Sequence, residues 1–307
     1  MKIVFMGNPS FACPSLELLN NSEHEVVGVI SDPPKSKNRK KIKTLSPLGQ
    51  KADELDLNLF TPQDLTSTSV IEWVKDLNPD IFIIVAFKIL PKKLIDIPRL
   101  GAINLHASLL PKYRGASPIQ YALMNQEKIT GNTTFFIIPQ VDKGNIILQS
   151  EIEINDQDNY QSLSKKLSYN GAELIIKSLH EINLNGFKPF TQDETKASYA
   201  PKIKSETCRI DWNEKASIVH SKIRALYNAP GAYTNFNGKR IKIHKSKIHL
   251  DQVSAHPGSF TIKNDSLFVS CSDFQLEILF LQPEGKRTMS ASEWTRGINK
   301  IPLTLFS

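Results

Sequence analysis

The sequence predicts an α/β protein. We expect a Rossmann-like doubly wound parallel sheet first and a smaller OB-like β-barrel at the C-terminal end. Three observations carry this prediction. Strand-like and helix-like segments alternate over the first half of the chain. Asp80–Ala86 is a continuous apolar run, which is typical of a strand buried on both faces of a parallel sheet. The last third instead carries short alternating strands separated by turn residues.

The N-terminal elements follow from their apolar periodicity and from the turn residues between them. The expected strands are Lys2–Met6, Val26–Ile30, Asp80–Ala86, Gly101–His106, Thr133–Ile138 and Ile146–Ile152, and the expected helices are Pro9–Asn20, Ser117–Asn125 and Asn159–Leu184. In such sheets, ligands bind beyond the carboxyl ends of the strands. The turn after the first strand, Gly7-Asn8-Pro9-Ser10, lacks the GxGxxG pattern, so we exclude an NAD-dependent enzyme.

The C-terminal elements follow a different pattern from the N-terminal ones, with one helix and then a run of short strands. An amphipathic helix is expected at Glu214–Tyr227, followed by the strands Ala232–Phe236, Arg240–His244, Gly258–Lys263, Ser266–Ser270 and Gln275–Leu281. The stretch before this helix carries Gly186, Pro189 and Pro201 among polar residues, which is typical of a linker. We therefore divide the chain into a domain at 1–188, a linker at 189–206 and a second domain at 207–307.

Composition narrows the class of protein. A chain of 307 residues suits two domains, and 40% hydrophobic with 22% charged residues are globular values. Cys13, Cys208 and Cys271 are far apart and form no CxxC pair, so neither a disulfide framework nor a zinc site is implied. No apolar run approaches the roughly 20 residues of a membrane helix. We expect a cytoplasmic monomer that needs no metal.

The positive charge is concentrated at one end of the chain. Residues 207–307 carry 14 Lys and Arg against 8 Asp and Glu, whereas residues 1–206 carry 24 against 23. This asymmetry favours a polyanionic partner held by the C-terminal domain, although a basic surface that only confers solubility is the alternative.

A basic insertion lies at Asp32–Leu48, where Lys35, Lys37, Arg39, Lys40, Lys41 and Lys43 are bounded by prolines. Two interpretations stand at this point: a solvated surface loop, or a loop that orders on a phosphate backbone.

The main candidates for chemistry are Asn104, His106 and Asp142. Asn104 and His106 are two residues apart at the end of an expected strand, so their side chains share one face. Asp142 lies in the loop between the next two strands, which is expected to reach the same edge. An amide and a protonated imidazole can stabilise an oxyanion, and a carboxylate can orient the imidazole or accept a proton. Taken singly, His106 could be a core histidine and Asp142 a turn residue.

The segment Asn104-Leu-His106-Ala-Ser108-Leu109-Leu110-Pro111-Lys-Tyr-Arg114-Gly115 resembles the central motif of the 10-formyltetrahydrofolate-dependent formyltransferases. Asp142-Lys143-Gly144-Asn145 is similar to the Asp-Thr-Gly-Asp element of that family, with Lys and Asn at its second and fourth positions. The stretches that resemble the branch acting on methionyl-tRNA are Tyr199-Ala-Pro201-Lys-Ile, Arg209-Ile-Asp211-Trp212, Pro230-Gly231-Ala232-Tyr233 and Gln282-Pro283-Glu284-Gly285-Lys286.

The resemblance implies a reaction and a set of site residues. The reaction would transfer the formyl group of 10-formyltetrahydrofolate, a co-substrate, to the α-amine of methionyl-initiator tRNA. Asn104, His106 and Asp142 would be catalytic. The loop of Ser108, Leu109, Leu110 and Pro111 would bind the folate. The candidates for tRNA binding are Arg39, Lys40, Lys41, Lys204, Arg240, Lys242 and Lys245. Arg114 could meet the folate glutamate or a tRNA phosphate, or form a surface ion pair.

Three rival interpretations share parts of this pattern. A formyltransferase acting on an amino-sugar nucleotide or a purine precursor would use the same three residues but would not need the basic C-terminal third. A folate hydrolase that releases formate would use water as the acceptor. A non-catalytic RNA-binding protein on the same scaffold would not need the intact Asn104, His106 and Asp142 set.

Overall fold

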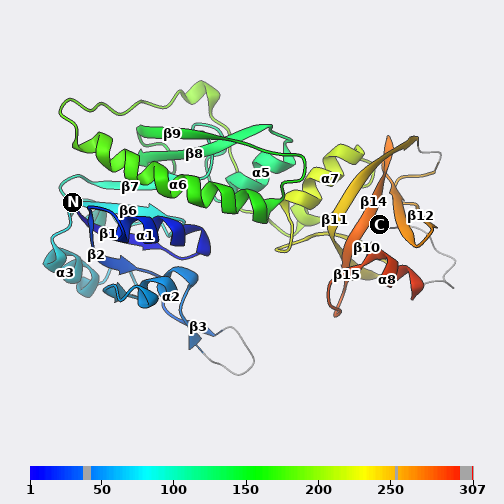
Figure 1. The fold of residues 1–307 in the computed structure, drawn as a ribbon, viewed down its shortest axis with the longest axis horizontal. Helices are drawn as coiled ribbons and strands as arrows, with labels where there is room; N and C mark the ends of the chain where they lie inside the picture. Colours follow the sequence, from blue (N-terminus) through cyan, green and yellow to red (C-terminus); the bar gives the residue numbers. More distant parts are fainter. Residues whose placement is uncertain (37–42, 253–254, 298–305, 307) are drawn as a thin grey trace. The chain divides into compact units, whose positions relative to one another are not determined.

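The computed structural model describes residues 1–36, 43–252, 255–297 and 306 (Figure 1). By its internal contacts, the chain forms two compact units. The first unit consists of Met1–Gly115, Ile129–Glu153 and Ser164–Ala200. The second consists of Ala116–Lys128, Ile154–Leu163 and Pro201–Ser307.

The first unit is built on a seven-stranded sheet of order β5-β2-β1-β6-β7-β8-β9. These strands are β1 (Lys2–Gly7), β2 (Glu25–Ile30), β5 (Leu59–Phe60), β6 (Ile81–Val85), β7 (Ala102–His106), β8 (Ile129–Phe136) and β9 (Ile146–Glu153). The pairs from β5 to β7 are parallel, as predicted, but β8 is antiparallel to both β7 and β9. The loop 137–145 is too short for a crossover helix, so β9 folds back beside β8.

Helices cover both faces of this sheet and confirm the doubly wound arrangement. They are α1 (Cys13–Asn20), α2 (Pro47–Glu54), α3 (Thr68–Leu77), α4 (Lys92–Ile95) and α6 (Tyr160–Asn183), with the short 3-10 turns η1 (Ser10–Ala12) and η2 (Glu194–Lys196). All five residues of β6 are buried. Ile83 and Val85 of β6 pack with residues of α1, α2 and α6, whereas Phe82 and Ile84 pack with α3 and α4. Helices α3 and α4 were not predicted from the sequence.

Strand β7 packs against α6 through Leu105, on the face opposite its polar residues Asn104 and His106. Leu105 lies in the core beneath α6. A Cβ atom added to Gly171 of α6 would lie 2.5 Å from a methyl carbon of Leu105, so glycine permits this close approach. Because side chains alternate along a strand, Asn104 and His106 point to the other face.

The second unit is built on an antiparallel sheet of order β10-β11-β14-β13-β12, with β15 paired to β14. Its strands are β10 (Ala232–Phe236), β11 (Lys239–Gln252), β12 (Phe260–Lys263), β13 (Ser266–Ser270), β14 (Phe274–Pro283) and β15 (Met289–Ser290). Its helices are α5 (Pro118–Met124), α7 (Ala216–Ala225) and α8 (Ala291–Arg296), with the 3-10 turn η3 (Glu206–Cys208). The fold class is thus confirmed, although β11 is longer than the expected Arg240–His244.

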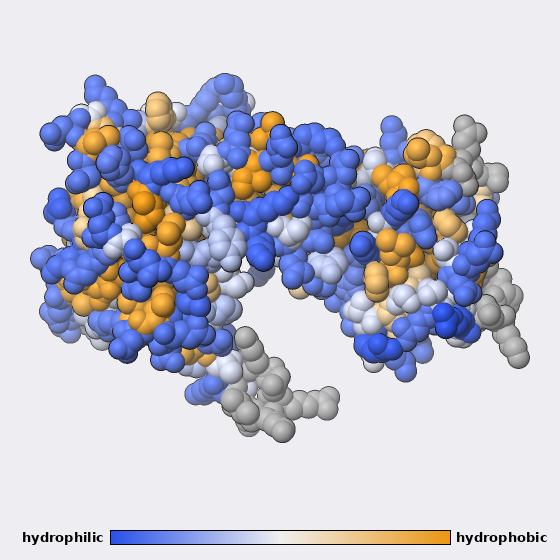
Figure 2. Space-filling view, viewed as in Figure 1, coloured by the Kyte–Doolittle hydropathy of each residue, from blue (hydrophilic) through white to orange (hydrophobic). Residues whose placement is uncertain are grey.

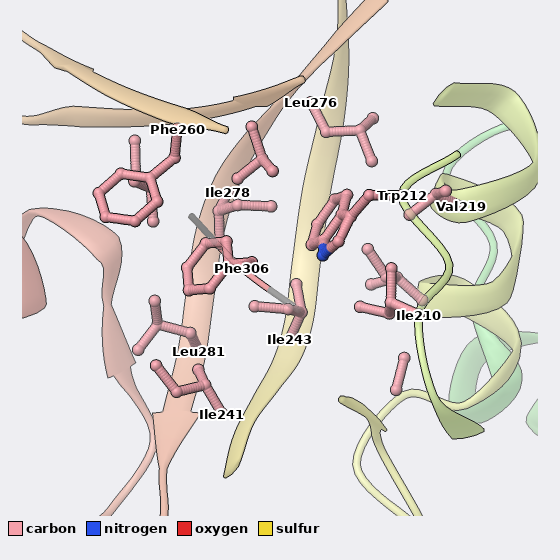
Figure 3. Close-up of a cluster of buried hydrophobic side chains, with 14 of the residues drawn as sticks. Ile210, Trp212, Val219, Ile241, Ile243, Phe260, Leu276, Ile278, Leu281 and Phe306 are labelled. Carbon is pink, nitrogen blue, oxygen red and sulfur yellow. The ribbon is translucent and has the colours of Figure 1, made fainter. Parts of the chain in front are cut away.

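Aliphatic side chains and a cluster of aromatic rings form the core of the second unit (Figure 3). The ring of Phe306 lies 4.9 Å from that of Phe260 and 6.0 Å from that of Trp212, between ring centroids. Trp212 is buried, and its indole N–H donates to the hydroxyl of Thr234 at 3.0 Å. The core therefore buries large apolar surface and satisfies the one polar group of the indole.

The surface seen in Figure 2 is mostly hydrophilic, with small hydrophobic patches on each unit. No helix among the described residues is long and apolar enough to cross a membrane.

The aromatic cluster generates a stability prediction. Phe306→Ala should lower the free energy of unfolding by about 3–5 kcal/mol, because it removes a buried ring and leaves a cavity. Urea unfolding followed by tryptophan fluorescence measures the change. Phe280→Ala, at a side chain that is 44% exposed, is the matched control and should change it by only about 0.5 kcal/mol. Equal effects of the two variants would contradict this view of the core.

Candidate active site

Asn104 and His106 lie at the carboxyl end of β7, at the parallel-to-antiparallel boundary of the sheet. Asn104 is half-buried and is flanked by Ile84 of β6 and Phe135 of β8. His106 is buried and pairs with Thr133 of β8. Among the described residues, none hydrogen-bonds the Asn104 side chain, so its amide is available to a ligand.

The imidazole of His106 has a defined orientation. Its Nε2 atom lies 2.9 Å from the backbone carbonyl oxygen of Tyr113. Because a carbonyl only accepts hydrogen bonds, Nε2 carries the hydrogen. The other nitrogen, Nδ1, faces Asp142, with 3.8 Å between Nδ1 and Oδ2. The reactive side of the ring is therefore Nδ1, and the carboxylate lies on that side.

Asp142 is set by the backbone of the loop after β8. Its φ of +54° lies in the left-handed region, and its Oδ2 accepts a hydrogen bond from the Gly115 N–H at 2.7 Å. Two residues on, a Cβ atom on Gly144 would lie 1.6 Å from the carbonyl oxygen of Phe136, so this position requires glycine. The loop thus brings Asp142 to the edge where β7 ends, as the sequence predicted.

The loop Ser108–Pro111 is fixed by one hydroxyl group. Thr133 Oγ1 donates to the Ser108 carbonyl at 2.6 Å and accepts from the Leu110 N–H at 3.0 Å. Gln149 Nε2 reaches both this hydroxyl and the Leu110 carbonyl. The side chains of Ser108 and Leu110 are buried, whereas Leu109 and Pro111 are partly exposed. A ligand at this loop would therefore meet Leu109, Pro111 and the backbone.

Arg114 forms an ion pair, as one of the sequence interpretations held, but its side chain is buried and not at the surface. It is 2% exposed, and its guanidinium forms a bidentate pair with Glu194, at 3.0 and 2.8 Å. Arg114 and then Lys143, by hydrogen bonds and charge, lower the pKa of Glu194 to about 2. No pattern in the sequence indicates this pair, because 80 residues separate its members.

The described part of the basic insertion is a short hairpin in the first unit. Strands β3 (Lys35–Ser36) and β4 (Lys43–Thr44) pair with each other. At its base, Asp32 accepts a hydrogen bond from Lys35 at 2.6 Å and forms an ion pair with Lys88, with 2.7 Å between Nζ and Oδ1. Burial alone would raise the pKa of Asp32, but these two lysines outweigh it and lower the pKa. Arg39, Lys40 and Lys41 lie outside the described residues.

The remaining basic candidates lie in the second unit. Arg240 and Lys245 are exposed and Lys242 is half-buried, all on β11. Strand pairing steps from Ile243 to Lys245, so a bulge at His244 shifts the alternation and keeps these three basic residues on the outward face. Exposed Lys204 precedes η3.

Aromatic groups lie beside this basic strand face. The Arg240 guanidinium lies 4.0 Å from the ring centroid of Tyr233, and Lys245 pairs with Phe280 of β14. A hollow of about 310 Å³ is lined by Arg240, Lys242, Gln282, Pro283, Glu284 and Gly285. Positive charge beside aromatic rings is a surface that suits a single-stranded or looped nucleic acid.

Comparisons with known proteins match most of the chain, over both of its units. The formyl transferase family model matches residues 1–179, and the formyl transferase C-terminal domain model matches residues 202–299. A methionyl-tRNA formyltransferase of Thermodesulfovibrio yellowstonii is 42% identical over 296 residues, which cover 96% of this chain and 95% of that protein. The methionyl-tRNA formyltransferase of Bacillus subtilis is 38% identical, with 96% and 94% covered.

Two solved structures share the fold at low sequence identity. HypX from Aquifex aeolicus, in complex with tetrahydrofolic acid, has a TM-score of 0.68 and 18% identity. The match covers 98% of this chain and 48% of HypX, so this chain spans about half of that protein. The sugar 3N-formyl transferase WlaRD has a TM-score of 0.67 and 22% identity, with 94% and 99% covered.

The ion pair of Glu194 predicts a pH dependence of stability. A carboxyl whose pKa is lowered on folding stabilises the fold above its ordinary pKa, near 4.5, and loses this contribution as the pH falls toward about 2. Glu194→Gln should therefore be less stable than the wild type at pH 6, and the two should converge as the pH falls. Urea unfolding at a series of pH values measures this. If the free energies of unfolding of the two proteins differed by the same amount at every pH, the Glu194 carboxylate would not be stabilised by this ion pair.

Proposed function

Because this chain belongs to the formyl transferase family, we propose that it moves the formyl group of 10-formyltetrahydrofolate to the α-amine of methionyl-initiator tRNA. The product is N-formylmethionyl-tRNA, which serves translation initiation. One observation carries the choice of acceptor. Relatives named methionyl-tRNA formyltransferase match at about 40% identity over both units, including the basic C-terminal one.

The reaction exchanges one C–N bond for another. The neutral α-amine attacks the formyl carbon, and a tetrahedral intermediate with a negatively charged oxygen forms. The bond from that carbon to N10 of the folate then breaks, the amine loses a proton and N10 gains one. The enzyme has to place the two substrates together and stabilise the oxyanion, and neither step requires a metal or a covalent intermediate.

We assign the oxyanion to Asn104 and His106. The Asn104 amide supplies a neutral donor, and its lack of a hydrogen-bond partner among the described residues supports this role. His106 in its protonated form supplies a charged donor at Nδ1, because Nε2 is already engaged by the Tyr113 carbonyl. A hydrogen bond from a charged donor is about twice as strong as one between neutral groups.

We assign Asp142 to the stabilisation of the His106 cation. Its Oδ2 lies on the Nδ1 side of the ring and is held there by the Gly115 N–H. The same carboxylate could carry the proton from the amine toward N10, since both positions would lie at this edge of the sheet. The loop Ser108–Pro111 would bind the folate through Leu109, Pro111 and its backbone.

We assign tRNA binding to the basic residues of the second unit. Arg240, Lys242 and Lys245 share the outward face of β11, and Lys204 would add a further phosphate contact. Arg39, Lys40 and Lys41 remain candidates on the family resemblance. The domains would be a catalytic one at 1–188, a linker at 189–206 and a tRNA-binding one at 207–307.

We further propose that the protein acts as a monomer in the cytoplasm. Cys13, Cys208 and Cys271 are all free thiols, as expected in a reducing compartment.

An acceptor comparison tests the function. Formyl transfer from 10-formyltetrahydrofolate should occur with methionyl-initiator tRNA and not with free methionine or an amino-sugar nucleotide. Transfer only to a small acceptor, or release of formate alone, would overturn the proposal.

In the same assay, Asn104→Ala should lower kcat by about 100- to 1,000-fold, since it removes one oxyanion donor. His106→Ala should lower it at least as much, and normal turnover in either variant would refute the site.

Removing charge from β11 should weaken tRNA binding in a salt-dependent way. For Arg240→Ala/Lys242→Ala, we expect a higher KM for the tRNA, an unchanged KM for the folate, and a salt slope of binding smaller by about two. Lys75→Ala/Lys177→Ala, which removes two exposed charges from the first unit, is the matched control. The same slope in both variants would show that β11 does not contact phosphates.

A further inference from the structure

The tripeptide of Tyr113, Arg114 and Gly115 contacts two of the three candidate catalytic side chains. The carbonyl of Tyr113 accepts from His106 Nε2 at 2.9 Å, and the N–H of Gly115 donates to Asp142 Oδ2 at 2.7 Å. Arg114 lies between them in the chain. Any movement of this backbone would therefore change the orientation of the imidazole and of the carboxylate together.

The backbone of this tripeptide is fixed by a segment far along the chain. The Arg114 N–H donates to the Ser198 carbonyl at 2.9 Å, and the Ala200 N–H donates to the Arg114 carbonyl at 2.7 Å. The Tyr113 N–H donates to the Ser198 hydroxyl at 2.9 Å. These contacts attach the middle of the expected linker, at Ser198 and Ala200, to the first unit, although both family models leave residues 180–201 unmatched.

The side chain of Gln192 then joins Arg114 to the Asp142 loop. Its Oε1 accepts from Arg114 Nε at 3.1 Å and from Nη2 at 2.6 Å. Its Nε2 donates to the backbone carbonyls of Asp142 at 2.8 Å and Gly144 at 2.7 Å. Gln192 is 6% exposed, and every donor and acceptor of its amide is used.

Glu194 closes the arrangement from the solvent side. It pairs with Arg114, as described above, and its Oε2 also accepts from Lys143 Nζ at 3.1 Å. Lys143 stands where the family pattern usually has threonine. In this chain the Asp142 loop is therefore held by the Lys143 side chain, which contacts Glu194, as well as by its backbone carbonyls, which contact Gln192. The two ends of the guanidinium are thereby fixed to Gln192 and to Glu194.

We propose that Gln192 is a positioning residue for formyl transfer, which holds Asp142 against His106 with the support of Arg114 and Glu194. The inference rests on the proposed function, because it gives Asp142 and His106 their roles. Asp142 has a φ of +54°, in the left-handed region that Asp tolerates better than most residues but that is still restrained by its contacts here. The two hydrogen bonds from Gln192 to this loop supply that constraint.

The test compares Gln192→Glu with Gln63→Glu. Gln192→Glu keeps the acceptors for Arg114 but loses both donors and places a carboxylate against two carbonyl oxygens. We expect kcat with methionyl-tRNA to fall about 100-fold, with the KM of both substrates unchanged, because the substrates still bind while the carboxylate is displaced. Gln63→Glu makes the same chemical change at an exposed residue and should have wild-type kinetics.

Hydrogen exchange gives a second readout that does not depend on activity. In Gln192→Glu, backbone amides of residues 137–145 should exchange faster, whereas those of β1 and β6 should not. Glu194→Gln should show a smaller loss of kcat, about 10-fold, because Arg114 keeps its bonds to Gln192. Glu194 is partly exposed, so this variant tests the proposal even if Gln192→Glu fails to fold.

Each outcome decides between the proposals. Faster loop exchange with normal kcat would overturn the positioning role and leave the proposed function intact. Unchanged exchange, or a raised KM with normal kcat, would also overturn it. If the wild-type protein fails to formylate methionyl-tRNA, the proposed function fails, and the positioning role fails with it.

Discussion

The candidate site depends on the backbone of Tyr113, Arg114 and Gly115. Its carbonyl at Tyr113 fixes which nitrogen of His106 carries the hydrogen, and its N–H at Gly115 binds the Asp142 carboxylate. A sheet edge alone would bring these residues near one another but would not set their orientations. The tripeptide sets both, and the buried Arg114 side chain anchors it. The orientation of both side chains therefore depends on a buried charge whose hydrogen bonds are accepted by Gln192 and Glu194.

A buried guanidinium is costly unless its donors are satisfied. Here Gln192 and Glu194 satisfy Nε, Nη1 and Nη2. The carboxylate is itself partly exposed, so the pair is not wholly removed from water. These hydrogen bonds and the partial exposure of Glu194 explain why the Arg114 guanidinium can be buried in the first unit. The buried ion pair contributes mainly to geometry. The planar Arg114 guanidinium, with fixed hydrogen-bond partners, restricts the loop that carries Asp142 more than an apolar contact would.

Residue patterns alone predicted the parts of the fold where one physical rule dominates. β6 was predicted because both its faces are buried, which leaves an uninterrupted apolar run. β11 was predicted too short, since the bulge at His244 breaks its alternation and hides the rest of the strand. Asn104, His106 and Asp142 were proposed from their spacing and from the family resemblance, and the fold brings His106 and Asp142 close together. Gln192 and Glu194 were not, because their partner Arg114 is 78 and 80 residues away and their function lies in contacts that only folding creates.

The most direct test of the account is the protonation state of the two nitrogens of His106. A long-range ¹H–¹⁵N spectrum of protein labelled at its seven histidines distinguishes Nε2–H from Nδ1–H in the neutral ring, and the His106→Ala spectrum identifies the signals. Neutral His106 is expected to carry its hydrogen on Nε2, held by the Tyr113 carbonyl, with Nδ1 facing Asp142. A hydrogen on Nδ1 in the neutral ring would contradict the arrangement from which the mechanism is derived.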